Sequence, residues 1–269
     1  MAFGFALVLM QIAAHAGAPA MAELVGVLLL ASGDDAVGVY TRASPVVGGA
    51  VCGRCTVPVL GRWLKNIFEE SPLNHAIKCK CGKLSGQLSH VEKTTRLICY
   101  CKDCQAFAHY LGKPGDVLDA QGGTDIVVSH PQEITFSTGA DEIACMSLSE
   151  SGLLRWYARC CNTPLGNTPR NNKLAFVGLS SACLGQPTAI DSAFGPVRMR
   201  SFPENAKGTV AASGVRAVPV MLGFGAALLL ARLSGSYARN PFFKPGSAEP
   251  VAQPTLLSKQ EREQLMARV

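Results

Sequence analysis

The chain has 269 residues, of which 48% are hydrophobic and 16% charged, and its formal net charge is +6. This apolar content with so little charge excludes a disordered chain, and the 27 glycines and 16 prolines follow no collagen period, which excludes a fibrous protein. The positive charge is spread along the chain without a block of Lys or Arg, so we expect no nucleic-acid partner.

Residues 1–73 are interpreted as an N-terminal extension. Their first 31 residues are largely apolar, but the first basic residue is Arg42, whereas a secretory signal needs positive charge ahead of its apolar core. We therefore expect no cleaved signal and a cytoplasmic protein. The composition changes near residue 74, so we expect this segment to be a disordered extension or a misplaced translation start, with initiation near Leu73. Cys52 and Cys55 lie in this extension and are predicted to be unrelated thiols.

Residues 74–200 form the predicted domain, which reads mainly as β-strands with short helices. Two hairpins are expected, one joining 125–129 to 133–137 and one joining 145–148 to 153–157 across a turn at 149–152. Further strands are expected at 83–90, 96–100 and 174–179. A short helix is expected at 105–111, ended by Gly112 and Pro114.

Residues 201–269 are predicted to form a C-terminal tail with two helices. The apolar run 217–231 spans about 22 Å as a helix, too short for a hydrocarbon core of about 30 Å. We therefore favour a surface or packing helix over a membrane-associated one. The charged end of the chain predicts a second helix, capped by Ser258.

The 11 cysteines are the most informative feature of the composition. An odd number argues against a fully disulfide-paired secreted protein, and clustering at short spacings favours metal ligands. Three groups lie in the predicted domain: Cys79 with Cys81; Cys99 with Cys101 and Cys104; Cys160 with Cys161. Cys145 and Cys183 stand alone and are predicted to be buried core thiols.

The spacing of these groups favours zinc, which prefers thiolate ligands presented in pairs by tight turns. Cys99, Cys101 and Cys104 supply three sulfurs from one segment and leave a fourth position open, which is typical of a catalytic zinc site. Cys79 and Cys81 need two further ligands for a closed structural site. Cys160 and Cys161 are the other clustered candidates.

This layout resembles the CENP-V/GFA family of glutathione-dependent formaldehyde-activating enzymes, which have a β-tent fold. The segments that carry the resemblance are Cys79-Lys-Cys-Gly-Lys83, Cys99-Tyr-Cys-Lys-Asp-Cys-Gln105 and Cys161-Asn-Thr-Pro-Leu-Gly166. A closer resemblance, to an uncharacterised bacterial branch of that family, rests on residues 104–108, 152–158, 194–197 and 235–243. The resemblance as a whole covers about residues 74–245.

The resemblance implies a catalytic zinc held by Cys99, Cys101 and Cys104, and a structural zinc held by Cys79, Cys81 and a late C-x-x-C pair. It also implies a carbon–sulfur lyase that acts on a thiol adduct such as S-hydroxymethylglutathione. In this chain, Cys161 matches the last member of the late pair, but Ala158 stands at the other position. The structural site would then use three sulfurs plus another ligand, or Cys79, Cys81, Cys160 and Cys161 in an unusual geometry, because adjacent side chains normally diverge.

Other functions stay open at this point. One is a non-catalytic zinc module used for binding, and another is a thiol redox sensor without bound metal. Asp103 and His109 flank the cysteine cluster and could transfer a proton, although roles at the start and on the surface of a helix are favoured for them. For Arg155 and Tyr157 a packing or surface role is favoured. The expected partner is a small-molecule thiol or its adduct, and the oligomeric state is not predicted.

Overall fold

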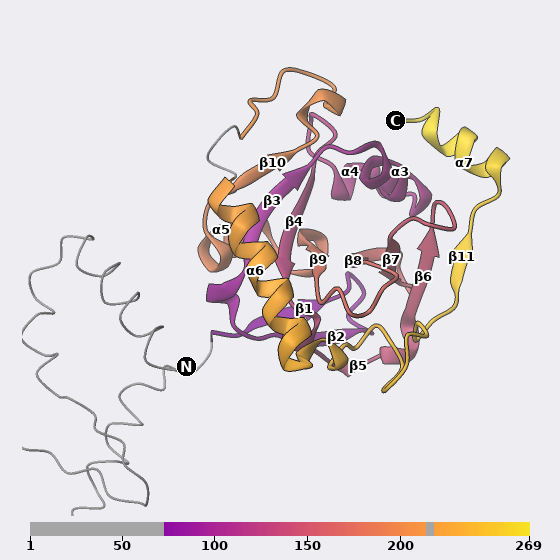
Figure 1. Cartoon of the computed structure of the whole chain (residues 1–269). Helices are drawn as coiled ribbons and strands as arrows, with labels where there is room; N and C mark the ends of the chain where they lie inside the picture. Colours follow the sequence, from indigo (N-terminus) through magenta and orange to yellow (C-terminus); the bar gives the residue numbers. More distant parts are fainter. Residues whose placement is uncertain (1–72, 214–217) are drawn as a thin grey trace, which may run out of the picture. The chain divides into compact units, whose positions relative to one another are not determined.

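The structure is a computed structural model that describes residues 73–213 and 218–269. The predictions for residues 1–72, including those for Cys52 and Cys55, lie outside the described residues. The described chain contains an eight-stranded sheet, a three-stranded sheet and short helices (Figure 1). The prediction of a mainly β fold with short helices and a C-terminal helical tail is confirmed.

The large sheet has the strand order β10-β3-β4-β9-β8-β7-β6-β11. In that order the strands are Met199–Ser201, Thr95–Cys99, Thr124–Ser129, Val177–Ser180, Thr163–Thr168, Leu154–Ala158, Ile143–Ser147 and Pro254–Leu256. The two edge strands, β10 and β11, run parallel to their neighbours, and all other pairs are antiparallel. The predicted hairpin across the turn at 149–152 is confirmed as β6–β7.

The small sheet has the order β1-β2-β5 and consists of His75–Lys78, Ser85–Leu88 and Ile134–Thr138. The predicted hairpin between 125–129 and 133–137 is wrong, because β4 pairs with β3 and β9 whereas β5 pairs with β2. A 3-10 turn, η3 (Pro131–Glu133), follows β4 and carries the chain out of the large sheet. The buried Ile134 then lies opposite Leu88 instead of a residue of β4.

One apolar core joins the two sheets. It contains Ile77 and Leu88 from the small sheet and Trp156 and Leu179 from the large one. The indole N–H of Trp156 donates to the hydroxyl of Thr168 at 2.9 Å, which satisfies a donor that would otherwise be costly to bury. Cys145 and Cys183 are buried in the same core, as predicted.

Helix α3 (Lys102–Tyr110) begins three residues earlier than predicted, because Cys101 is its N-cap and the Cys101 sulfur accepts the backbone N–H of Cys104. Its apolar face, which includes Phe107, packs with Leu265 of α7 (Lys259–Met266). Ser258 caps α7 in a capping box, as predicted. The remaining short elements are α4 (Pro114–Val117), α5 (Pro187–Phe194) and the 3-10 turns η2 (Val91–Lys93), η4 (Ala140–Glu142), η5 (Ser181–Cys183), η6 (Pro203–Asn205) and η8 (Ser236–Ala238).

Residues 218–231 of the predicted apolar run lie in the surface helix α6 (Val218–Ser234), and residue 217 lies outside the described residues. The ring of Phe224 meets that of Phe176 edge-on, with 5.6 Å between centroids, while Leu222, Leu230 and Leu233 are exposed. Within residues 73–213 and 218–269, the structure has no helix with the length and apolar character needed to cross a bilayer. Contact of α6 with a membrane surface, the less favoured alternative, stays untested.

Candidate metal centres

The described residues contain two groups of cysteines that could hold a metal ion. The first joins the loop between β1 and β2, which carries Cys79 and Cys81, to the turn between β7 and β8, which carries Cys160 and Cys161. Their four sulfur atoms all lie within 4.8 Å of one another. This is the second of the two arrangements left open by the sequence.

The turn explains how two adjacent cysteines reach one point. The backbone N–H of Cys161 donates to the carbonyl oxygen of Ala158 at 3.3 Å, and Asn162 adopts a left-handed conformation with φ 53. Asn tolerates this conformation better than most residues do. The chain therefore reverses sharply, and the Cys160 and Cys161 sulfurs end up 3.8 Å apart rather than on opposite faces of a strand.

The sulfur spacing in this first group fits a tetrahedral metal site. With Zn–S bonds of about 2.3 Å, two sulfurs of a tetrahedron lie about 3.8 Å apart. Cys79 lies 3.5 Å from Cys81 and 3.8 Å from Cys160, and Cys81 lies 3.3 Å from Cys160. We call Cys79, Cys81, Cys160 and Cys161 the four-sulfur cluster; with four sulfurs it has the ligand number of a closed structural site.

The second group, Cys99, Cys101 and Cys104, lies where β3 ends and α3 begins, and we call it the three-sulfur cluster. Its sulfurs also lie within 4.8 Å of one another, with 3.8 Å between those of Cys99 and Cys104. Cys99 and Cys104 are buried, and Cys101 is half-buried. The C-x-C-x-x-C spacing thus brings three sulfurs to one point, and all three line a groove of about 510 Å³.

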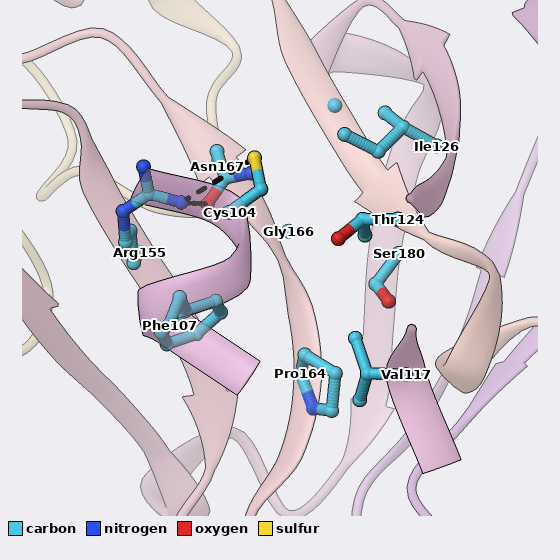
Figure 2. A pocket seen from close by; sticks show the side chains of 11 residues that line it. Cys104, Phe107, Val117, Thr124, Ile126, Arg155, Pro164, Gly166, Asn167 and Ser180 are labelled. Carbon is cyan, nitrogen blue, oxygen red and sulfur yellow. Dashed lines mark hydrogen bonds between the residues drawn. The ribbon is translucent and has the colours of Figure 1, made fainter. Parts of the chain in front are cut away.

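Arg155 is the residue of this site whose role the sequence did not reveal. A packing or surface role was favoured for it, but its guanidinium is buried against the three-sulfur cluster: Nη1 lies 3.8 Å from the Cys104 sulfur and 3.2 Å from Asn167 Oδ1 (Figure 2). Nη2 lies 3.6 Å from an Asp103 carboxylate oxygen, and the guanidinium stacks over the Phe107 ring. The sequence pattern that could have indicated a buried Arg155 is its position between two large apolar residues, Leu154 and Trp156, which are both buried in the structure.

The charges around Cys104 favour its thiolate form. Side-chain hydrogen bonding with Cys101 and Cys99 lowers the pKa of Cys104 well below its ordinary value, and the charge of Arg155 adds to this against the opposing effect of burial. A hydrogen bond with Cys101, the bond with Cys104 and burial raise the pKa of Cys99. Asp103 lines the groove, while His109 lies farther along α3 and does not line it. Of these two candidate proton carriers, the fold brings Asp103 to the site.

A small cavity lies between Cys104 and Arg155 on one side and Thr124 and Ser180 on the other (Figure 2). Its volume is about 10 Å³, roughly that required for one water molecule. The hydroxyl of Thr124 is buried there, and it has no hydrogen-bond partner among the residues that the structure describes. The cavity therefore offers a polar contact next to the three-sulfur cluster.

The comparisons with known proteins place the chain in a family without naming an activity. Residues 73–253 match a family of unknown function, DUF6151. A comparison with curated proteins finds no match. The family match begins just before β1, ends just before β11 and includes both cysteine clusters. Because this match covers more than half of the chain, the protein belongs to the DUF6151 family.

Proposed function

We propose that the protein is a zinc-dependent enzyme that cleaves or forms a carbon–sulfur bond in a thiol adduct, as its resemblance to the CENP-V/GFA family implies. The observation that carries the proposal is the three-sulfur cluster at the wall of a groove. Three protein ligands beside accessible space leave one position open, which is typical of catalytic rather than structural zinc. The four-sulfur cluster is proposed to hold a second, structural zinc ion.

A zinc ion held by Cys99, Cys101 and Cys104 supplies Lewis acidity and stabilises a thiolate at neutral pH. Arg155 contacts Cys104 from the buried side and helps to balance the negative charge of the cysteine thiolates. Asn167 and Asp103 hold the guanidinium in place, at 3.2 Å and 3.6 Å. Phe107 covers one face of the guanidinium and limits its contact with water.

The reaction proposed for a hydroxymethyl thioether gives a free thiol and an aldehyde. Asp103, with a side chain that is 43% exposed at the groove, accepts the hydroxyl proton. The electron pair of that O–H bond forms the C=O bond, while the pair of the C–S bond leaves with the sulfur as a thiolate. Asp103 then returns the proton to the thiolate, so no external oxidant or reductant is required. The reverse sequence adds a thiol to an aldehyde.

Metal content tests the first half of the proposal. The wild-type protein is expected to bind two zinc ions per chain, and Cys101→Ser is expected to bind one. Cys145→Ala removes a buried thiol outside both clusters and serves as the control, with two zinc ions retained. A wild-type protein without bound zinc would overturn the proposal and favour the thiol redox sensor.

Turnover tests the second half. Cleavage of the adducts that formaldehyde and longer aldehydes form with small thiols, glutathione included, is followed by NMR for the zinc-loaded protein. The wild type and Cys145→Ala should accelerate cleavage of at least one adduct, whereas Cys101→Ser should not. Two bound zinc ions with no acceleration of any adduct would refute the enzyme and favour a zinc module used for binding.

A further inference from the structure

The groove beside the three-sulfur cluster is lined by apolar side chains as well as by the cysteines and other polar residues. Six apolar side chains line it: Leu97, Ile126, Val128, Leu153, Phe176 and Phe202. They come from five different parts of the chain, namely β3, β4 and the segments beside β7, β9 and β10. Arg155 and Asn167 lie next to the sulfurs, and Lys102, Asp103, Ser201 and Asn205 are the other polar residues of the lining, but most of the lining surface is apolar.

The size of the groove exceeds what a one-carbon aldehyde needs. Its volume of about 510 Å³ falls within the range of about 300–1,000 Å³ found for pockets that hold drug-sized ligands. Lys102, Ser201 and Asn205 also line the groove and could pair with some polar groups of a ligand, but most of the lining surface is apolar, so a ligand that is polar along its whole length would leave some of those groups unpaired. A hydrocarbon group matches those walls without this penalty.

Phe202 supports a binding role for the apolar wall. It adopts a left-handed conformation with φ 57, which is uncommon for an aromatic residue, and the residue is 53% exposed. An exposed aromatic ring held by a strained backbone gains little for stability, and such strain is found at ligand clamps. Phe202 therefore lies at the groove as a side chain available for ligand contact.

The apolar lining also continues beyond the groove. Val128 lines both this groove and a second one beneath α6, whose wall includes Phe224. Phe224 in turn packs edge-on against Phe176 of the first groove. The apolar surface thus leads away from the sulfurs along β4 toward α6, in the direction that a chain of several carbons would require.

We propose that the groove binds the hydrocarbon part of a thiol adduct whose carbon group is a medium-length alkyl or aryl chain. The hydroxyl or carboxylate of the adduct faces Arg155 and Asn167, and the chain starts beside Phe202, near the sulfurs, and runs along Leu97 and Val128 away from them. This substrate class rests on the function proposed above, since that function is what brings a thiol adduct to the site. It differs from the one-carbon adduct that the family resemblance implies.

The test uses two thioethers that cannot react, S-methyl-N-acetylcysteine and S-hexyl-N-acetylcysteine. Binding of each to the zinc-loaded full chain is measured by isothermal titration calorimetry. Each buried methylene contributes about a fourfold gain in affinity. With about half of the five additional methylenes buried, the hexyl probe should bind about 30-fold more tightly than the methyl probe.

Variants locate the effect in the groove. Phe202 and Leu153 are partly exposed, so Phe202→Ala and Leu153→Ala should fold normally. Each should reduce the preference for the hexyl probe to about tenfold or less. Leu222→Ala, on the exposed face of α6 and outside the groove, should leave it at about 30-fold.

Equal affinity for the two probes, or a preference that Phe202→Ala and Leu153→Ala leave unchanged, would overturn the inference. Because neither probe reacts, these outcomes are independent of turnover. A preserved preference in a protein without lyase activity would refute the proposed reaction but keep the ligand class. Lyase activity limited to formaldehyde adducts, together with equal affinities for the two probes, would support the proposed reaction but refute the ligand class.

Discussion

A metal ion in the four-sulfur cluster would cross-link distant parts of the chain, so its removal should lower stability by a calculable amount. Cys81 and Cys160 are 79 positions apart, and their sulfurs lie 3.3 Å from each other. A cross-link that closes a loop of this length lowers the entropy of the unfolded chain by an amount worth about 4.5 kcal/mol. For a domain of this size, 1 kcal/mol shifts Tm by about 2–4 °C, so the expected decrease in Tm is about 9–18 °C.

The assay is thermal unfolding followed by circular dichroism, with and without a chelator. Without chelator, Cys160→Ala should already have a Tm close to that of the metal-free wild type, and the chelator should change its Tm much less. The reason is that the Cys160 sulfur contacts the three other sulfurs of the cluster. Cys183→Ala is the matched control because it truncates a buried thiol outside the cluster. Its Tm should be lower than that of the wild type, but the chelator should lower it further by the same amount as in the wild type.

The three-sulfur cluster spans only the short segment from Cys99 to Cys104, so its metal constrains the unfolded chain less. Repeating the melts in the Cys101→Ser background therefore isolates the contribution of the four-sulfur cluster. A Tm that falls by less than about 3 °C when the zinc is shown to have left that cluster would refute the cross-link argument.

Three further predictions concern the stability of the scaffold, each measured by urea unfolding or hydrogen exchange. Thr124→Val should leave the free energy of unfolding unchanged or raise it by up to about 1 kcal/mol, because the buried hydroxyl has no hydrogen-bond partner within residues 73–213 and 218–269; a decrease of more than about 1 kcal/mol would mean that the hydroxyl is hydrogen-bonded in solution. Ser258→Ala should remove about 1 kcal/mol from α7 and speed amide exchange there but not in β7, because it breaks the capping box. Arg96→Met should cost about 2–3 kcal/mol, because it leaves the partly buried Asp125 unpaired, whereas Lys80→Met, which breaks an exposed ion pair, should cost less than about 1 kcal/mol.

The features that could be predicted from the sequence are those with local causes. The β6–β7 hairpin follows from turn residues between two apolar runs, and the α7 cap follows from Ser258 ahead of a charged helix. The grouping of Cys99, Cys101 and Cys104 is local too, since all three lie within a single strand-to-helix turn. In each case the signal lies within one continuous stretch of the sequence.

The features that could not be predicted depend on contacts between distant parts of the chain. Ile134 lies opposite Leu88 because burial in the shared core outweighs the short connection from β5 back to β4. The edge strands β10 and β11 have three residues each, too few to show an alternating pattern. The choice of Cys160 and Cys161 as partners of the β1–β2 loop stayed open for the same reason.

The position of Arg155 has a local cause, whereas its contacts depend on distant parts of the chain. Its place on β7 follows from the hairpin pattern, but its contact with Cys104 depends on where α3 packs against the large sheet. An arginine in an apolar strand is compatible with an edge position, where the guanidinium reaches water. Only the arrangement of β7 between β6 and β8 shows that the side chain is enclosed and must find its partners inside the protein.

The β7–β8 hairpin connects the two clusters physically. Arg155 and Asn167 are register partners on this hairpin, and Cys160 and Cys161 form the turn at its end. Three residues separate Arg155 from the end of β7, which corresponds to about 10 Å of strand. A metal ion in the four-sulfur cluster would fasten this turn to the β1–β2 loop and so limit movement of the strands that hold the guanidinium against Cys104. A metal ion in the four-sulfur cluster would therefore support the chemistry proposed for the three-sulfur cluster, because the contacts of Arg155 with Cys104 and Asp103 are useful only while the hairpin that presents Arg155 stays in place.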